Sequence, residues 1–219
     1  MKKYKACIFD FDLTLADSSK GILICFRHTL ENFGYPVPDD RTIYNTIGMP
    51  LTDAFDVLTG ESLTAEKREA MRVEYVHKAD EVMVKYTFFY DGVIDGLKAL
   101  REHDIKVGIC SSKMRYRIVQ SFEGKAGELP VDVIIGLGDT SKPKPDPSSL
   151  FECISQLGFG KEDILYVGDN LIDAQTAQNA GVDFGAVLTG STGHEEFEQL
   201  PSVIIAERLT DIIRFVYET

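Results

Sequence analysis

The feature that most constrains this chain is a set of short, continuously apolar runs that each stop abruptly at a polar residue or a glycine. Continuous apolar runs are typical of strands covered on both faces, as in parallel sheets, because a half-exposed strand would alternate apolar and polar residues. The runs, each with the residue at which it stops, are 6–9 (Asp10), 105–110 (Ser111), 131–135 (Gly136) and 164–167 (Gly168).

Stretches with helical periodicity follow these runs and complete a β-α-β alternation, near residues 94–103, 113–123, 147–157 and 171–180. With right-handed crossovers, this order predicts an α/β fold with a doubly wound, mostly parallel, Rossmann-like sheet. An amphipathic pattern at 211–217 predicts a closing helix. Ligands of such sheets bind outside the carboxyl ends of the strands, which is where the polar residues fall.

One long segment breaks the alternation. Residues 16–88 show helical patterns and no convincing strand, with turn signals at Pro36–Asp40 and Ile47–Pro50. We therefore expect a small helical domain at 16–88, inserted as a cap into a core domain made of residues 1–15 and 89–219. Hinges are expected near 15–17 and 89–92.

Composition argues against several classes of function. The 23 Lys and Arg residues face 35 Asp and Glu, so the net charge is −12 and nucleic acid is not an expected partner. No apolar run approaches the 18–20 or so residues that a membrane span needs, so no membrane association is expected. Cys7, Cys25, Cys110 and Cys153 share no close spacing, which favours reduced thiols and a cytoplasmic protein.

Two carboxylates follow the first strand, in the run Asp10-Phe11-Asp12-Leu13-Thr14. Acids this close repel each other unless a positive charge lies between them. Mg²⁺ prefers hard oxygen ligands and commonly takes one or two carboxylates together with a phosphate, so a magnesium site is one interpretation. A polar turn after a strand is the other.

Two further strand ends carry groups suited to binding an anion. Ser111-Ser112-Lys113 offers hydroxyls and N–H groups at a helix start, although serines that only cap a helix would look the same. The run 142–147 holds three prolines, which would stiffen a loop that presents Lys142 to an anion. A solvated linker is the alternative, and Lys144 and Lys113 are expected at the surface.

The fourth strand is followed by Gly168-Asp169-Asn170-Leu171-Ile172-Asp173. Gly168 permits a tight turn, and the spacing of Asp169 and Asp173 puts both carboxylates on one face of the first helical turn. Acids also stabilise helix N-termini on their own, by about 0.3–1 kcal/mol, so capping is a competing interpretation.

Taken together and in this order, Asp10-x-Asp12-x-Thr14, Ser111, Lys142 and Gly168-Asp169-x-x-x-Asp173 resemble the four motifs of the haloacid dehalogenase-like hydrolase superfamily. The resemblance covers essentially the whole chain and is to the branch of phosphoglycolate phosphatases and β-phosphoglucomutases, which carry a helical cap. It implies a Mg²⁺-dependent phosphatase that acts on a small phosphorylated metabolite, with phosphoglycolate as the leading substrate, as a monomer or a homodimer.

The resemblance also implies a role for each motif. Asp10 would be the nucleophile that forms an aspartyl-phosphate, and Asp12 the general acid and base. Phosphate oxygens would be bound by Ser111 and Lys142 and by the N–H groups of Phe11, Asp12 and Ser112. The metal would be held by the side chains of Asp10 and Asp169, the backbone carbonyl of Asp12, and Asp173. Gly48 in the cap would contribute to specificity.

Two departures from the family pattern and several alternatives stay open. Leu13 stands where most of these phosphatases have Gly, and Asp91 stands where Pro is common. Leu13 could crowd the pocket and so change the substrate. A phosphomutase, a pyrophosphatase or a nucleotidase of the same superfamily would fit the motifs. A non-enzymatic, phosphate-responsive module of the receiver type would lack both the helical insert and the need for Asp12.

Overall fold

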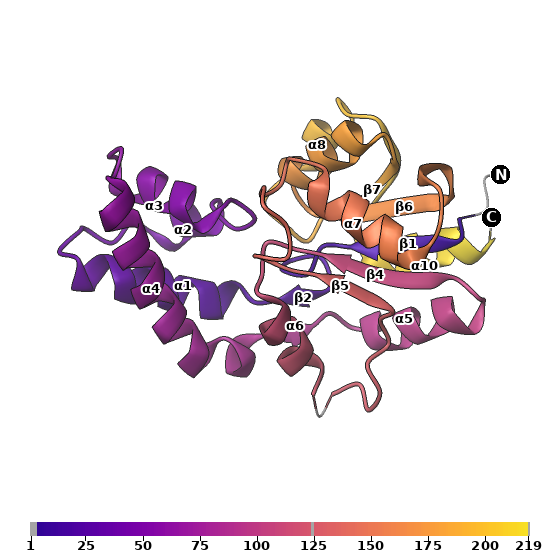
Figure 1. Cartoon of the computed structure of the whole chain (residues 1–219), viewed down its shortest axis with the longest axis horizontal. Coiled ribbons are helices and arrows are strands. Elements are labelled where there is room, and N and C mark those ends of the chain that lie inside the picture. Colours follow the sequence, from indigo (N-terminus) through magenta and orange to yellow (C-terminus); the bar gives the residue numbers. More distant parts are fainter. Residues whose placement is uncertain (1–3, 124, 219) are drawn as a thin grey trace. The chain divides into compact units, whose positions relative to one another are not determined.

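The computed structural model describes residues 4–123 and 125–218. The chain divides into two compact units, one made of Met1–Ala16 with Phe89–Thr219 and the other of Asp17–Phe88 (Figure 1). One boundary coincides with the one expected from the sequence, and the other differs by a single residue.

A six-stranded parallel sheet forms the centre of the larger unit, with strand order β5-β4-β1-β6-β7-β8. The strands are β1 (Ala6–Phe9), β4 (Lys106–Cys110), β5 (Val133–Ile135), β6 (Ile164–Gly168), β7 (Asp183–Val187) and β8 (Ser202–Ala206). The prediction of a doubly wound, mostly parallel α/β fold is confirmed.

Helices cover both faces of this sheet, because alternate strand residues point to opposite sides. Cys7 and Phe9 of β1 pack in a core with α5, α6 and α10, whereas Ala6 and Ile8 pack in a second core with α7 and α8. Figure 1 shows α7 and α8 on one side of the sheet and α5 and α6 on the other. The helices are α5 (Val93–Glu102), α6 (Arg115–Phe122), α7 (Ser148–Leu157), α8 (Leu171–Ala180), α9 (His194–Phe197) and α10 (Leu209–Glu218), and a 3₁₀ turn, η2 (Lys161–Asp163), precedes β6.

The smaller unit is helical and has its own apolar centre. Phe26, Phe55 and Tyr75, from three different helices, meet edge to face with ring centroids 4.9–6.2 Å apart. Such aromatic pairs contribute about 0.5–1.5 kcal/mol beyond their buried area. The elements are α1 (Ser19–Asn32), α2 (Asp40–Tyr44), α3 (Leu51–Thr59), α4 (Ala65–Val82) and the 3₁₀ turn η1 (Val84–Tyr86).

Two very short strands lie where the chain passes between the units. β2 (Ala16–Asp17) and β3 (Phe88–Phe89) pair with each other as a two-stranded sheet. The sequence does not predict them, because two residues carry no periodicity. β7 and β8 were not predicted either, since Asp183 and Gly185 interrupt one apolar run and β8 is a half-buried edge strand.

None of the helices in residues 4–123 and 125–218 is long and apolar enough to cross a membrane.

Candidate active site

The first polar residues after three neighbouring strands lie together at one edge of the sheet. β1 lies between β4 and β6, so Asp10, Ser111 and Asp169 follow strand ends that are side by side. The Asp10 N–H donates to the carbonyl of Val167 at 2.9 Å, and the Ser111 N–H donates to that of Ile135 at 3.0 Å. The hydrogen bonding of the sheet thus continues one residue beyond the strands and fixes the backbone of both polar residues.

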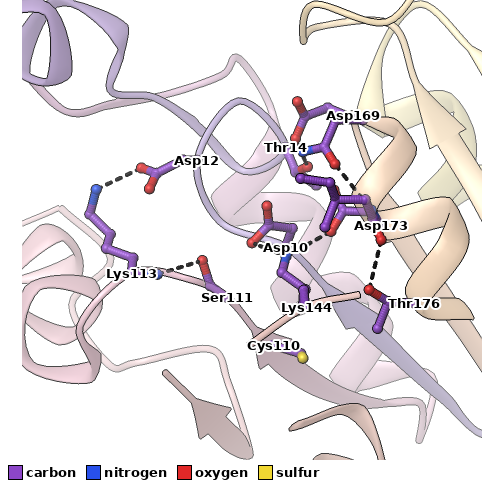
Figure 2. A network of polar contacts seen from close by, with 12 residues as sticks. Asp10, Asp12, Thr14, Cys110, Ser111, Lys113, Lys144, Asp169, Asp173 and Thr176 are labelled. Carbon is purple, nitrogen blue, oxygen red and sulfur yellow. Dashed lines mark hydrogen bonds and ion pairs between the residues drawn. The ribbon is translucent and has the colours of Figure 1, made fainter. Parts of the chain in front are cut away.

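Three carboxylates meet at this edge. One oxygen from each of Asp10, Asp169 and Asp173 lies within 4.8 Å of the others, and all three residues are at most 3% exposed (Figure 2). Asp173 is placed by the start of α8, where Asn170 Oδ1 accepts a hydrogen bond from the Asp173 N–H at 3.0 Å. Glycine is required at 168, because a Cβ there would approach the Asp173 side chain to 2.3 Å.

A lysine ammonium is buried against these acids, and it belongs to Lys144. Its Nζ lies 2.7 Å from Asp173 Oδ1 and 3.2 Å from Asp10 Oδ1, with the side chain 3% exposed. The same Nζ donates to the hydroxyl of Tyr166 at 3.2 Å, and that hydroxyl lies 2.8 Å from Asp173 Oδ1.

The expectation that Lys142 would be this lysine, with Lys144 at the surface, is wrong. Lys142 has a side chain that is 67% exposed and pairs with Asp146 at 3.4 Å. Two hydrogen bonds hold the loop that carries both lysines. The Asp146 carboxylate accepts a hydrogen bond from the Ser148 N–H at 3.0 Å, and the Asn179 side chain donates one to the carbonyl of Pro145 at 2.9 Å. In this conformation only the second of the two lysines points inward.

Burial dominates the electrostatics of the cluster. It raises the pKa of Asp10 to about 6, an effect that the Lys144 ammonium opposes and the charge of Asp173 reinforces. Burial, followed by the charges of Asp173 and Asp10, also raises the pKa of Asp169 well above its usual range. Desolvation works against the charge of Lys144, but Asp10 and Asp173 outweigh it, so its pKa is raised.

The donor set fits a divalent cation. Asp10 Oδ1 and Asp173 Oδ2 are buried, and neither accepts a hydrogen bond from any residue that the structure describes; the 3.2 Å contact of Asp10 Oδ1 with Lys144 is an ion pair without hydrogen-bond geometry. When all are ionised, three carboxylates facing one ammonium leave an excess of two negative charges. Hard oxygen ligands carrying that charge are what Mg²⁺ binds.

The Asp12 carboxylate does not belong to the acid cluster. It forms an ion pair with Lys113, whose Nζ lies 2.6 Å from Asp12 Oδ1 (Figure 2). Lys113 was expected at the surface, but its side chain is only 5% exposed, and its Nζ lies 5.4 Å from the ring centroid of Phe11. The backbone N–H of Lys113 donates a hydrogen bond to Ser111 Oγ at 3.3 Å. The sequence signal that could have located it is its place two residues after Ser111.

The loop after β1 is held by two hydroxyls. Thr14 Oγ1 donates to Asp169 Oδ1 at 2.7 Å, which connects the first and fourth motifs. Thr189 donates a hydrogen bond to the carbonyl of Leu13, whose own N–H donates to the carbonyl of Ala16 at 2.8 Å. Leu13 has a φ of 60°, a left-handed conformation that favours glycine, which accounts for the Gly that the family pattern has here.

The remaining candidate residues differ in how the structure places them. Phe11 is fully buried, with its ring edge-on to Phe89 at 5.9 Å, so its side chain is part of the core. Ser112 is half-buried between Ser111 and Lys113. Gly48 lies in the smaller unit, in the turn before α3, with a φ of 97°. The roles expected for Gly48, Ser112 and the Phe11 N–H stay predictions. Tyr166 was not anticipated, because within an apolar run it is indistinguishable from core.

Comparison with known proteins is consistent with this geometry. The model of the haloacid dehalogenase-like hydrolase family matches residues 7–187. Pyrophosphatase PpaX of Halalkalibacterium halodurans is 30% identical over 210 residues, covering 95% of each chain. Pyrophosphatase PpaX of Listeria innocua is 29% identical and covers 98% of this chain and 97% of its own.

Solved structures agree. A haloacid dehalogenase-like hydrolase described from Bacteroides fragilis is 40% identical and superposes with a TM-score of 0.93, covering 96% of this chain and 100% of its own. A chain from Lactobacillus plantarum, described as a phosphoglycolate phosphatase, is 24% identical with a TM-score of 0.85, covers 97% of this chain and 99% of its own, and supports the fold alone. The chain belongs to the haloacid dehalogenase-like hydrolase family, as the motifs predicted.

Proposed function

We propose that this protein is a Mg²⁺-dependent phosphatase that hydrolyses a small phosphorylated metabolite through an aspartyl-phosphate on Asp10. The observation that carries the proposal is the position of the Asp10 carboxylate. It is buried at the end of the central strand, 3.2 Å from the Lys144 ammonium and within the three-carboxylate cluster. A carboxylate held beside positive charge can approach an anionic phosphate, which would otherwise repel it.

In the first step, an oxygen of Asp10 attacks phosphorus as the bond from phosphorus to the leaving oxygen breaks. Asp12 gives a proton to the departing oxygen. In the second step, Asp12 accepts a proton from a water molecule whose oxygen attacks the phosphorus of the aspartyl-phosphate. Inorganic phosphate is released and the Asp10 carboxylate is restored.

Asp10, Asp169 and Asp173 are the side chains that would hold Mg²⁺, together with the backbone carbonyl of Asp12. When bound, the cation supplies positive charge that offsets the repulsion between the carboxylate and the phosphate. Thr14 orients Asp169 through its hydroxyl, at 2.7 Å, and Lys144 orients Asp173 through the 2.7 Å ion pair.

The transferring phosphoryl group would be bound by Lys144, in the role first assigned to Lys142, and by the Ser111 hydroxyl. The N–H groups of Phe11, Asp12 and Ser112 would complete the cradle. Preorganised donors of this kind are effective because they need no reorganisation as charge develops on the phosphoryl oxygens.

Phosphoglycolate and pyrophosphate are the two leading substrates. Phosphoglycolate is the substrate that the resemblance of the four motifs implies. Pyrophosphate is the substrate in the name of relatives that align along nearly the whole chain. The smaller unit, Asp17–Phe88, would act as a cap that selects the leaving group, with Gly48 in its specificity turn.

Phosphate release from a panel of phosphorylated metabolites, with and without Mg²⁺, tests the proposal. Asp10→Asn should abolish turnover and incorporation of phosphate into the protein, whereas Asp95→Asn, an exposed acid on α5, should leave both unchanged. Free phosphate should accumulate without isomerised sugar phosphate, which separates a phosphatase from a mutase. Turnover that survives Asp10→Asn would overturn the mechanism.

A further inference from the structure

The ion pair between Lys113 and Asp12 is unusual for its burial. The Lys113 side chain is 5% exposed, whereas the Asp12 side chain is 17% exposed and so retains some access to solvent. Ion pairs at the surface contribute little, but a lysine is rarely buried without a partner, because removing the ammonium from water is costly. The pair lies in the larger unit, 2.6 Å across, beside the nucleophile loop.

Lys113 and Lys144 approach Asp10 from different sides. Figure 2 shows Lys144 among Asp10 and Asp173, and shows Lys113 with Asp12 on the other side of Asp10. An attacking carboxylate and a leaving oxygen must be roughly in line through phosphorus. Lys144 is therefore placed to bind the transferring phosphoryl group. Lys113 lies beside Asp12, the residue that would contact the leaving oxygen.

The Lys113 ammonium has capacity for a further acceptor. An ammonium has three N–H donors. One is directed at Asp12 Oδ1, and the face of Phe11 lies on another side. A substrate oxygen next to Asp12 could therefore accept a hydrogen bond from Lys113 while the ion pair stays intact.

A fixed positive charge at this place discriminates between leaving groups. An alcohol that leaves with a proton from Asp12 carries no charge for an ammonium to stabilise. A departing phosphate is charged throughout, and its charge grows as the bond breaks. We propose that Lys113 binds the departing phosphate, so that the site selects phosphoanhydrides, such as pyrophosphate, over esters of neutral alcohols. This inference rests on the function proposed above.

The step balances without any further reactant. Asp10 bonds to one phosphorus, the bond from that phosphorus to the bridging oxygen breaks, and the electron pair of that bond leaves on the bridging oxygen. That oxygen belongs to the second phosphate, which departs paired with the Lys113 ammonium. Because this leaving group departs as an anion, Asp12 stays ionised in its pair with Lys113 and gives it no proton. Asp12 then accepts a proton from the water that attacks the aspartyl-phosphate, and that proton passes to a product phosphate or to solvent. One pyrophosphate and one water thus yield two phosphates.

Three substrates and three variants test the inference, and the third substrate is phosphoglycolate, an alkyl phosphate assayed with the wild-type protein. Lys113→Met removes the charge and keeps the length, Lys113→Arg keeps the charge, and Lys142→Met is a matched control at an exposed lysine of the same unit. Each protein is assayed with Mg²⁺ on pyrophosphate and on p-nitrophenyl phosphate, whose leaving group carries one delocalised charge. Calorimetry measures the binding of methylenediphosphonate, a non-hydrolysable analogue of pyrophosphate, and of inorganic phosphate.

A charge-assisted hydrogen bond to the leaving phosphate corresponds to roughly 10–100-fold in rate. We expect Lys113→Met to lower kcat/KM for pyrophosphate by about that factor and for p-nitrophenyl phosphate by less than about threefold. Methylenediphosphonate should bind at least about tenfold more weakly and inorganic phosphate equally well. Lys113→Arg should recover most of both losses, and Lys142→Met should match the unmodified protein.

Equal losses on both substrates would overturn the inference, because they would mean that Lys113 only positions Asp12. A wild-type protein that turns over p-nitrophenyl phosphate but prefers an alkyl phosphate to pyrophosphate would also overturn it, and would leave the proposed function intact. If neither these substrates nor any member of the metabolite panel is turned over, the proposed function fails. Unchanged binding of methylenediphosphonate by Lys113→Met would then refute the inference by itself. Should Lys113→Met not fold, Lys113→Gln takes its place.

Discussion

Replacing Lys144 by Met should destabilise the larger unit far more than the same change at Lys142, which lies two residues earlier in the same proline-rich loop. The Lys144 ammonium lies 2.7 Å from Asp173 and 3.2 Å from Asp10, and its side chain is 3% exposed. Removing one partner of a buried ion pair costs about 3–5 kcal/mol, because the other charge is left without compensation. Here Lys144→Met leaves three buried carboxylates facing one another.

The corresponding change in melting temperature follows from the size of the chain. At about 2–4 °C per kcal/mol for a chain of this length, Lys144→Met should lower Tm by about 6–20 °C in metal-free buffer. The Lys142 side chain is 67% exposed and pairs with Asp146 at 3.4 Å. Exposed pairs contribute about 0–1 kcal/mol, so Lys142→Met should lower Tm by no more than about 4 °C.

Thermal unfolding followed by circular dichroism measures both effects, in buffer that contains either about 2 mM EDTA or about 10 mM Mg²⁺. Mg²⁺ should recover part of the stability lost in Lys144→Met, since a divalent cation replaces the missing positive charge. Phosphatase activity should fall by about 10³-fold in Lys144→Met, given about 4 kcal/mol for a unit charge pair at 4 Å. Equal Tm values for the two variants, or a larger loss in Lys142→Met, would refute the assignment.

Three further outcomes follow from the same contacts. Burial raises the pKa of Asp10 to about 6, so the folded state keeps the Asp10 proton to a higher pH than the unfolded chain does. The Tm of the metal-free protein should therefore fall as pH rises from about 4 to 6. Urea titrations over the same pH range should show a smaller loss of unfolding free energy in Asp10→Asn. Tyr166→Phe removes only a buried hydroxyl that contacts Lys144 and Asp173, and chemical denaturation should show a loss of about 1–2 kcal/mol; no loss would mean that the hydroxyl contributes nothing. Leu13→Gly relieves about 1 kcal/mol of strain from the left-handed backbone at this position. It also removes a side chain that is 1% exposed, and losing such a side chain costs about 2–5 kcal/mol. Calorimetry should therefore find a net destabilisation, and a stabilised variant would contradict this.

The layout of the site could be predicted because it follows from local patterns. Continuous apolar runs mark buried parallel strands, and the residue after each run must lie at the carboxyl edge of the sheet. That reasoning places Asp10, Ser111 and Asp169 before any coordinates are known. Asp169 and Asp173 do converge, with oxygens within 4.8 Å of one another and of Asp10. The predicted reason is wrong, because α8 begins at Leu171 with Asn170 as its N-cap, so Asp169 lies before the helix and not on its first turn.

Lysine burial could not be predicted in the same way. Lys142 and Lys144 are each followed by proline, so their local sequences are nearly equivalent. The loop that carries them is held by a local turn at Asp146 and Ser148 and by a tertiary contact of Asn179 with the Pro145 carbonyl, and the second of these is not visible in the sequence. Lys113 is buried because of groups about a hundred residues away in sequence, the Asp12 carboxylate and the Phe11 ring. The sequence marks Lys113 only by its place two residues after Ser111, whereas the identity of its distant partner is set by the tertiary fold.

The central position of β1 has a consequence for synthesis on the ribosome. β1 is made first, yet both of its neighbours come much later, β4 at Lys106–Cys110 and β6 at Ile164–Gly168. At about 5–20 residues per second, the nascent chain carries this apolar segment for roughly 8–30 s before its second edge can be covered. An unpaired apolar edge is a template for aggregation. Chaperone dependence during translation should therefore centre on β1.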